Sequence, residues 1–60
     1  MKIEIISRAE NLTTYGVYKN NLQPVGVIEE TSRSRDYYAL TNSTNREEIK
    51  KAFYKYMSIA

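Results

Sequence analysis

The first apolar positions of the chain alternate with polar ones, which is the period of a half-buried strand. In the stretch KIEIIS, Ile3 and Ile5 alternate with a lysine and a glutamate, and Ile6 falls on the opposite side. Successive side chains of a strand point to opposite faces, so this pattern predicts a strand over residues 2–7. The polar run RAEN then ends it.

Two later segments are rich in β-branched and aromatic residues, which favour strands. They are TTYGVYK, residues 13–19, and PVGVIEET, residues 24–31, and the NNLQ between them has the asparagines that tight connections favour. A further segment, DYYALT, residues 36–41, follows the polar stretch SRSR. This order predicts an antiparallel meander.

The apolar period then changes to that of a helix. Over residues 43–57, Thr44 stands three residues before Glu47, the spacing of a capping box in which both side chains bind free backbone donors. The apolar residues that follow share the spacing of one helical stripe. They are Ile49, Ala52, Phe53, Tyr56 and Met57.

A helix with one apolar stripe needs a surface to cover, and the sheet is the surface that this pattern offers. We therefore expect an α+β fold, a small antiparallel sheet of three or four strands with one C-terminal α-helix packed on one face, as a single domain over residues 1–60. The pattern leaves open whether the first strand joins this sheet or pairs with another chain. A chain of 60 residues has a small core, so we expect self-association or a partner to supply part of the stability.

Alternation within the strands assigns side chains to the two faces of the sheet. Expected under the helix are Tyr15, Val17, Val25, Val27, Tyr38 and Leu40. Expected on the outer face are Gly16, Tyr18, Gly26, Ile28, Tyr37 and Ala39, with Arg33 and Arg35 in phase with Tyr37. Glycine inside a strand marks a bulge or a close approach by another backbone, and both interpretations stay open.

Tyrosine is the unusual residue of this chain, with six copies and no tryptophan. An outward tyrosine offers a large contact area together with a hydroxyl, whereas an inward one packs in the core. The expected core members are Tyr15, Tyr38 and Tyr56, and the expected outward members are Tyr18, Tyr37 and Tyr54.

Catalysis and metal binding have little support in this composition. The chain has no histidine and no cysteine, and its hydroxyl and amine side chains stand in no motif that activates a nucleophile. The carboxylate pairs Glu29/Glu30 and Glu47/Glu48 are sequence neighbours, so their side chains diverge. We expect no catalytic residue, no cofactor and no metal, and hence a protein that is not an enzyme.

The charge is mixed, with nine Lys and Arg against seven Asp and Glu. The basic residues form two groups, Arg33 with Arg35 and Lys50 with Lys51 and Lys55. Each group is either a solvated face or a contact for phosphates or for the acidic residues of a partner. Arginine suits a bidentate partner better than lysine does.

No apolar run is long enough for a signal peptide or a membrane span. We therefore expect a cytoplasmic protein that does not bind membranes.

The run YYALTNSTNREEIKKAFYKY, a strand that passes through a polar loop into a capped helix, resembles the element order of the integrase arm-type and AP2-type DNA-binding domains. The resemblance covers less than half of the chain and implies DNA binding by the outer face of the sheet. Those domains carry Arg, Lys and Trp on that face, whereas Tyr, Gly, Ile and Ala are expected here.

Three functions follow from these patterns. The first is a protein-binding module, an inhibitor or adaptor that modulates a larger host protein; the usage of Lys, Asn, Ile and Tyr resembles that of small accessory proteins of phages and mobile elements. The second is a nucleic-acid-binding domain that uses the outer face with Arg33 and Arg35. The third is a self-assembling component, such as a homodimer. The candidate partner-binding residues are Tyr18, Ile28, Arg33, Arg35, Tyr37, Lys51, Tyr54 and Lys55.

Overall fold

The computed structural model describes residues 1–20 and 23–59. Its elements follow one another as β1 (Lys2–Arg8), β2 (Thr13–Tyr18), β3 (Gly26–Glu30), β4 (Arg35–Ala39) and α1 (Arg46–Ile59). The predicted tight connection over residues 20–23 lies partly outside the described residues.

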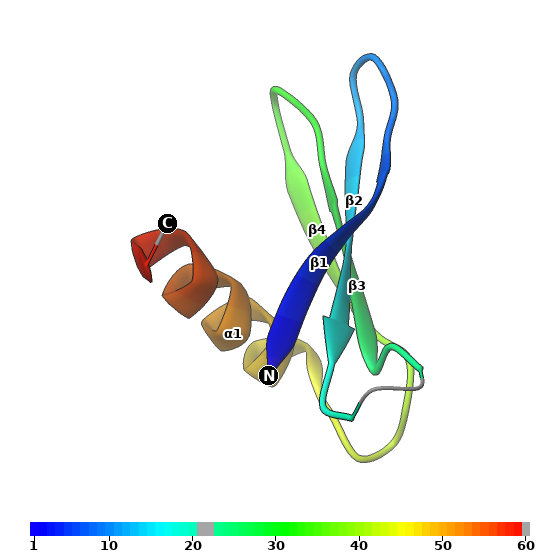
Figure 1. Cartoon of the computed structure of the whole chain (residues 1–60), viewed down its shortest axis with the longest axis vertical. Helices are drawn as coiled ribbons and strands as arrows, with labels where there is room; N and C mark the ends of the chain where they lie inside the picture. The colour runs from blue at the N-terminus through cyan, green and yellow to red at the C-terminus, as the bar shows by residue number, and fades with distance from the viewer. Residues whose placement is uncertain (21–22, 60) are drawn as a thin grey trace.

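The four strands form one antiparallel sheet in the order β1-β2-β3-β4. Both hairpin turns, β1–β2 and β3–β4, lie at the same end of the sheet and extend beyond the helix (Figure 1). The helix packs on one face, against β1, β3 and β4. The predicted α+β fold is thereby confirmed, and β1 is a member of the sheet.

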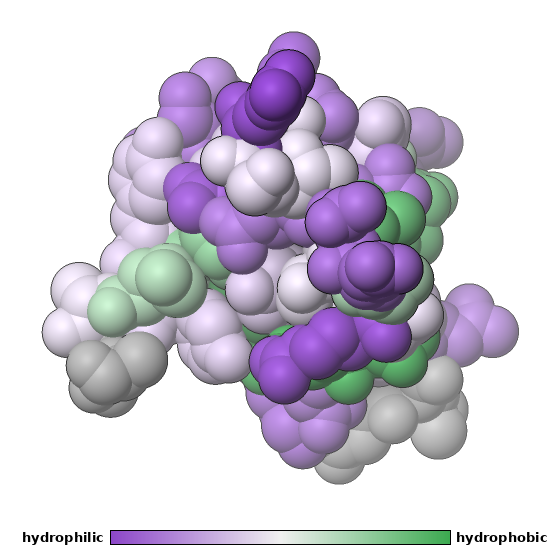
Figure 2. Space-filling model, turned by 90° about the horizontal axis from the view of Figure 1, so that it is seen from above, coloured by the Kyte–Doolittle hydropathy of each residue, from purple (hydrophilic) through white to green (hydrophobic). Residues whose placement is uncertain are grey.

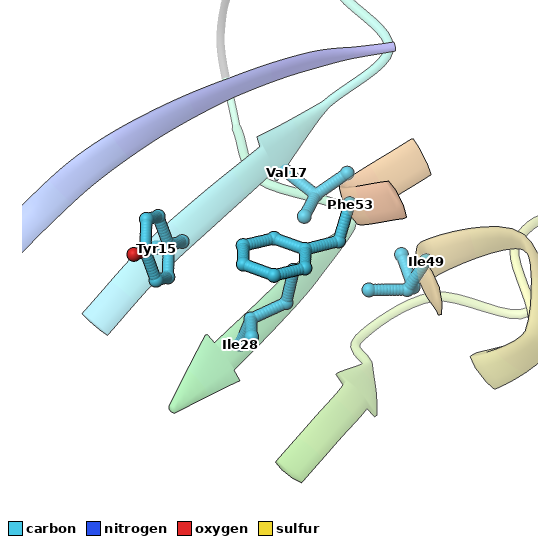
Figure 3. Close-up of a cluster of buried hydrophobic side chains, with 5 residues drawn as sticks. All are labelled: Tyr15, Val17, Ile28, Ile49 and Phe53. Carbon is cyan, nitrogen blue, oxygen red and sulfur yellow. The ribbon is translucent and has the colours of Figure 1, made fainter. Parts of the chain in front are cut away.

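The core lies between α1 and the face of the sheet that it covers, which we call the inner face. Its buried side chains converge on Phe53, which is fully buried (Figure 3). The ring of Phe53 meets that of Tyr15 edge to face at 5.0 Å between centroids and that of Tyr37 at 6.2 Å. Such aromatic pairs contribute roughly 0.5–1.5 kcal/mol beyond the area they bury. The buried hydrophobic residues are Tyr15, Val17, Ile28, Ile49 and Phe53.

The buried stripe of the helix contains fewer residues at its C-terminal end than the sequence predicts. Ile49 and Phe53 are fully buried, and Tyr56 packs against the core. Met57, expected on the same stripe, is 48% exposed, so its predicted place against the sheet is wrong.

Two of the three predicted strand faces are wrong. Strand pairing sets Tyr15 opposite Ile28 and Ile28 opposite Tyr37. Directly paired residues of an antiparallel sheet share a face, so Ile28 and Tyr37 lie on the inner face with Tyr15. A shift of one residue in register exchanges the two faces of a strand.

The residues that exchange faces follow from the same pairing. Val27 pairs with Gly16 and with Tyr38, on the side away from the helix. Val27 and Tyr38 are thus outer residues, contrary to the prediction, and Leu40 continues that alternation. The assignment of Tyr15 and Val17 to the inner face is confirmed by their burial, while Val25 packs partly against the core as expected.

Helix α1 begins one residue later than the sequence predicts. The backbone N–H of Glu48 donates to Asn45 Oδ1 at 2.9 Å, and the Asn45 N–H donates to Glu48 Oε1 at 3.2 Å. This reciprocal pair is a capping box with asparagine in the first position. The predicted box of Thr44 and Glu47 is therefore wrong. Thr44 is buried, and its Oγ1 has no hydrogen-bond partner within the described residues.

Gly26 lets the helix approach the sheet closely. A Cβ at this position would overlap Ile49 Cδ1 and would lie 3.0 Å from the carbonyl oxygen of Tyr38. Ile49 is fully buried and has no free space to move into. Gly26 pairs with the inner-face Val17, so its predicted place on the outer face is wrong, and the space left by its missing side chain is taken by Ile49 of the helix.

We predict that Gly26→Ala destabilises the protein by about 1–3 kcal/mol, the usual range for an overpacked core. Gly16→Ala is the matched control. Its added methyl would lie 2.6 Å from Ile6 Cδ1 and 2.9 Å from the Tyr18 ring, and both of these side chains lie on the open face, where they can rotate away. Urea denaturation of both variants measures the difference. Equal losses of stability in Gly26→Ala and Gly16→Ala would show that Ile49 does not pack closely against Gly26.

Substitution of Asn45 by alanine should cost about 1 kcal/mol, the usual loss for an N-cap. In contrast, Thr44→Val should leave the stability unchanged or raise it, because it replaces a buried hydroxyl that lacks a partner by a methyl of similar size. Thermal unfolding followed by circular dichroism compares the two. The reverse order of stabilities would restore Thr44 as the cap.

Candidate functional site

The face of the sheet opposite the helix carries a group of apolar and aromatic residues that no element covers within the described part of the chain. We call it the outer patch. Three of its members, Ile6, Tyr38 and Leu40, are between 45% and 54% exposed. Its members are Ile6, Tyr18, Val27, Tyr38 and Leu40.

Strand β1 delivers Ile6 to this patch through a bulge. Ile5 pairs with Tyr15 and Ser7 with Thr14, so that Ile6 is the extra residue between them. Ile6 Cδ1 and the Tyr18 ring both lie over Gly16, close enough that a Cβ there would meet them. Gly16 is therefore buried, although it lies on the outer face. The absence of a side chain at this position brings Ile6 and Tyr18 together.

Acidic residues border the outer patch. Glu29 and Asp36 pair directly across β3 and β4, and Glu4 pairs with Gly16. All three lie on the outer side by alternation. The negative charges of Asp36 and then Glu29 raise the pKa of the exposed Tyr38 hydroxyl. Tyr38 therefore keeps its proton and remains a hydrogen-bond donor at neutral pH.

Arg35 lies on the inner face, where it closes the edge of the core. Its Nε and Nη2 donate to Glu30 Oε2 at 2.8 and 2.5 Å, and Nη1 donates to Tyr37 Oη at 3.4 Å. Its guanidinium carbon lies 4.5 Å from the centroid of Phe53, a cation–π arrangement. The Tyr15 hydroxyl donates to the other oxygen of Glu30 at 3.1 Å.

The protonation states of this cluster support one another. The hydrogen bonds from Arg35 lower the pKa of Glu30, and the bond from Tyr15 adds to this effect against the cost of burial. Burial raises the pKa of Tyr15, and its hydrogen bond to Glu30 raises it further. At neutral pH Glu30 is thus a carboxylate that accepts from a charged and from a neutral donor. The cluster contributes to stability and offers no free general base.

The predicted site residues are distributed over three surfaces. Tyr18 lies on the outer face as expected. Ile28 is fully buried and Tyr37 packs on Phe53, so the outward positions predicted for both are wrong. Arg35 shares the inner face with Tyr37, and its predicted outward position is also wrong.

Arg33 lies in the β3–β4 turn, where it is exposed. Thr31 Oγ1 accepts hydrogen bonds from the backbone N–H groups of Arg33 and Ser34 at 3.2 and 3.1 Å, and these bonds shape the turn. Seen from the end where both turns lie, the surface is mostly hydrophilic, with hydrophobic residues showing between the polar ones (Figure 2). Arg33 belongs to the β3–β4 turn and not to the strands that carry the outer patch.

The helical candidates form a third surface. Lys51, Tyr54 and Lys55 are exposed on α1. Lys50 Nζ lies 5.9 Å from the centroid of the Tyr54 ring. The outward position predicted for Tyr54 is confirmed by its exposed fraction of 53%. Because α1 covers the inner face, these residues lie across the sheet from the outer patch.

Four residues of the outer patch were not among the sequence candidates: Ile6, Val27, Tyr38 and Leu40. A signal for two of them was present. Glu30 and Arg35 flank the polar loop TSRS, and an opposite-charge pair across a hairpin favours direct pairing. That pairing alone sets Ile28 opposite Tyr37 and places Val27 and Tyr38 on the other face.

The described residues contain no group of three or more acidic, His or Cys side chains placed to hold a metal ion. Within residues 1–20 and 23–59, no helix has the length and apolar character needed to cross a membrane. Comparisons with protein-family models, with curated proteins and with solved structures found no match.

Stability should fall at acid pH through Glu30. Its pKa in the folded state is below the ordinary 4.5, so the stabilisation is present above that value and is lost as the pH falls through the folded pKa. Glu30→Gln should remove part of this pH dependence and cost about 1 kcal/mol at pH 7. Thermal unfolding between pH 2.5 and 7 measures both. Glu10→Gln, in the β1–β2 turn, is the control, and an equal flattening of its profile would contradict the role of Glu30.

Proposed function

We propose that this chain is a small non-enzymatic protein-binding module whose outer patch is the contact surface. One observation carries the proposal: helix α1 covers one face of the sheet, and the opposite face exposes Ile6, Tyr38 and Leu40. Contiguous exposed apolar groups with a polar border mark binding surfaces on small proteins. Tyrosine is also among the residues that contribute most to binding energy at protein interfaces.

The border of the patch indicates the chemistry of the partner. Glu29 and Asp36 lie beside Tyr38 and Val27 on β3 and β4, whereas Glu4 on β1 is paired with Lys2, although the chain as a whole has a net charge of +2. Complementary charge favours encounter and fixes orientation. The expected partner is a larger protein with an apolar surface that lysine or arginine residues border. An inhibitor or adaptor would act by covering such a surface.

Nucleic-acid binding by the same face has less support. That hypothesis needs outward arginines, whereas Arg35 is held by Glu30 on the inner face. Glu29 and Asp36 at the border of the patch repel phosphates, and phosphate contacts dominate affinity for nucleic acids. The basic candidates that are exposed, Arg33, Lys51 and Lys55, lie on the turn and on the helix, and the exposed Lys2 on the outer side is paired with Glu4.

The test compares two tyrosines of similar exposure on opposite sides of the molecule. Tyr38→Ala should weaken binding to a partner captured from lysate by more than about 1 kcal/mol, roughly fivefold or more, because it removes a large exposed aromatic side chain from the patch. Tyr54→Ala should leave the affinity unchanged. Isothermal titration calorimetry with the purified partner measures both.

Nuclease treatment of the lysate should leave the partner bound. Loss of every partner after nuclease would favour nucleic-acid binding. Loss of binding in Tyr54→Ala with retention in Tyr38→Ala would assign the contact to the helix and would overturn the proposal. Circular dichroism of both variants confirms that they are folded.

A further inference from the structure

The free edge of β1 carries the features of a strand that pairs with a second copy. In the described sheet β1 pairs with β2 on one side, and its other side faces no strand. Edge strands present unpaired backbone N–H and C=O groups that favour the addition of another strand. On the inner face of this edge, Met1 is 52% and Ile5 43% exposed.

An apolar hollow adjoins this edge on the helix side. It has a volume of about 180 Å³. Its walls come from the start of the chain and from α1: Met1, Ile3, Ala52, Lys55 and Tyr56. Apolar groups added at the β1 edge would extend this small core, which buries only five hydrophobic side chains in the described chain.

The bulge limits which residues of β1 can pair with a further strand. Its extra residue, Ile6, interrupts the regular strand between Ile5 and Ser7, and bulges end pairing at sheet edges. Regular pairing is therefore available up to Ile5.

The charges before the bulge select the centre of the pairing. Lys2 and Glu4 are neighbours on the outer side, with Nζ and Oε2 3.5 Å apart, and both are exposed. An antiparallel two-fold pairing that keeps the faces continuous can be centred on residue 2, 3 or 4. A centre at Lys2 sets lysine against lysine, and one at Glu4 sets glutamate against glutamate. A centre at Ile3 sets each Lys2 against Glu4 of the second copy. Because like charges directly opposite are destabilising, the centre at Ile3 is favoured over the other two.

We infer that the protein forms a two-fold dimer in which β1 pairs antiparallel with β1 of a second copy about Ile3. The sheets join into one of eight strands. Lys2 and Glu4 of the two copies form a cluster of four alternating charges on the outer side. On the inner side Met1 lies beside Ile5 of the second copy, so that both become covered. This inference is independent of the proposed function, because the outer patch stays open.

Exchange of one charge per chain tests the register directly. Lys2→Glu and Glu4→Lys should each weaken self-association on the order of tenfold or more, because each homodimer then contains two like-charge pairs across the axis. A mixture of the two variants should form a heterodimer as tight as the wild type, since every facing pair is opposite again. The pair within one chain cannot produce this recovery, because it is repulsive in both variants.

Sedimentation equilibrium over a range of protein concentrations measures the three samples and the wild type. Circular dichroism checks the fold, and both positions are exposed. A wild type that stays monomeric at millimolar concentration would overturn the inference. A wild-type dimer that neither variant weakens would also overturn it and would assign association to β4 or to the outer patch. A mixture of the two variants that gives no heterodimer would overturn it as well.

Discussion

The structure depends on the burial of Phe53 between the helix and the sheet. Its ring contacts Tyr15 and Tyr37 edge to face and has the Arg35 guanidinium over it. Truncation of a buried phenylalanine to alanine costs about 3–5 kcal/mol, and a single core of this size supplies about as much in total. The packing of one ring therefore decides whether the helix stays on the sheet. The ion pair of Arg35 and Glu30 covers one side of that ring.

Helix α1 packs on one face of the sheet, and the other face stays open within the described residues. One helix of 14 residues can cover a single face of a four-stranded sheet, and the described chain has no second helix for the other. Two features of the sequence shape this open face. Gly16 lets Ile6 and Tyr18 lie close together, and acidic residues border the patch. This open face is the surface on which the proposed function rests.

The strands and the helix follow from short-range patterns, so the fold class was predictable. Alternation over Ile3 and Ile5 and the helical spacing of Ile49 and Phe53 each depend on neighbours along the chain. The faces of β3 and β4 were not predictable in this way, because both sides of these strands are apolar. Val27 and Ile28 are adjacent, as are Tyr37 and Tyr38. Register then decides the face, and register depends on pairing between strands.

The helix start shows the same limit on a smaller scale. Thr44 and Asn45 are both good capping residues, and each has a glutamate three positions later. Asn45 is the N-cap because Thr44 is buried and its side chain does not cap the helix. Tertiary packing decides between two local patterns of similar strength.

The central claim is that Ile28 and Tyr37 lie under the helix while Val27 and Tyr38 lie on the open face. Nuclear Overhauser effects from the Phe53 ring protons measure this most directly in solution. The structure predicts strong effects to the side chains of Tyr15, Ile28 and Tyr37, and none to those of Val27 and Tyr38. Strong effects from Phe53 to Val27 and Tyr38 would contradict the register and, with it, the identity of the outer patch.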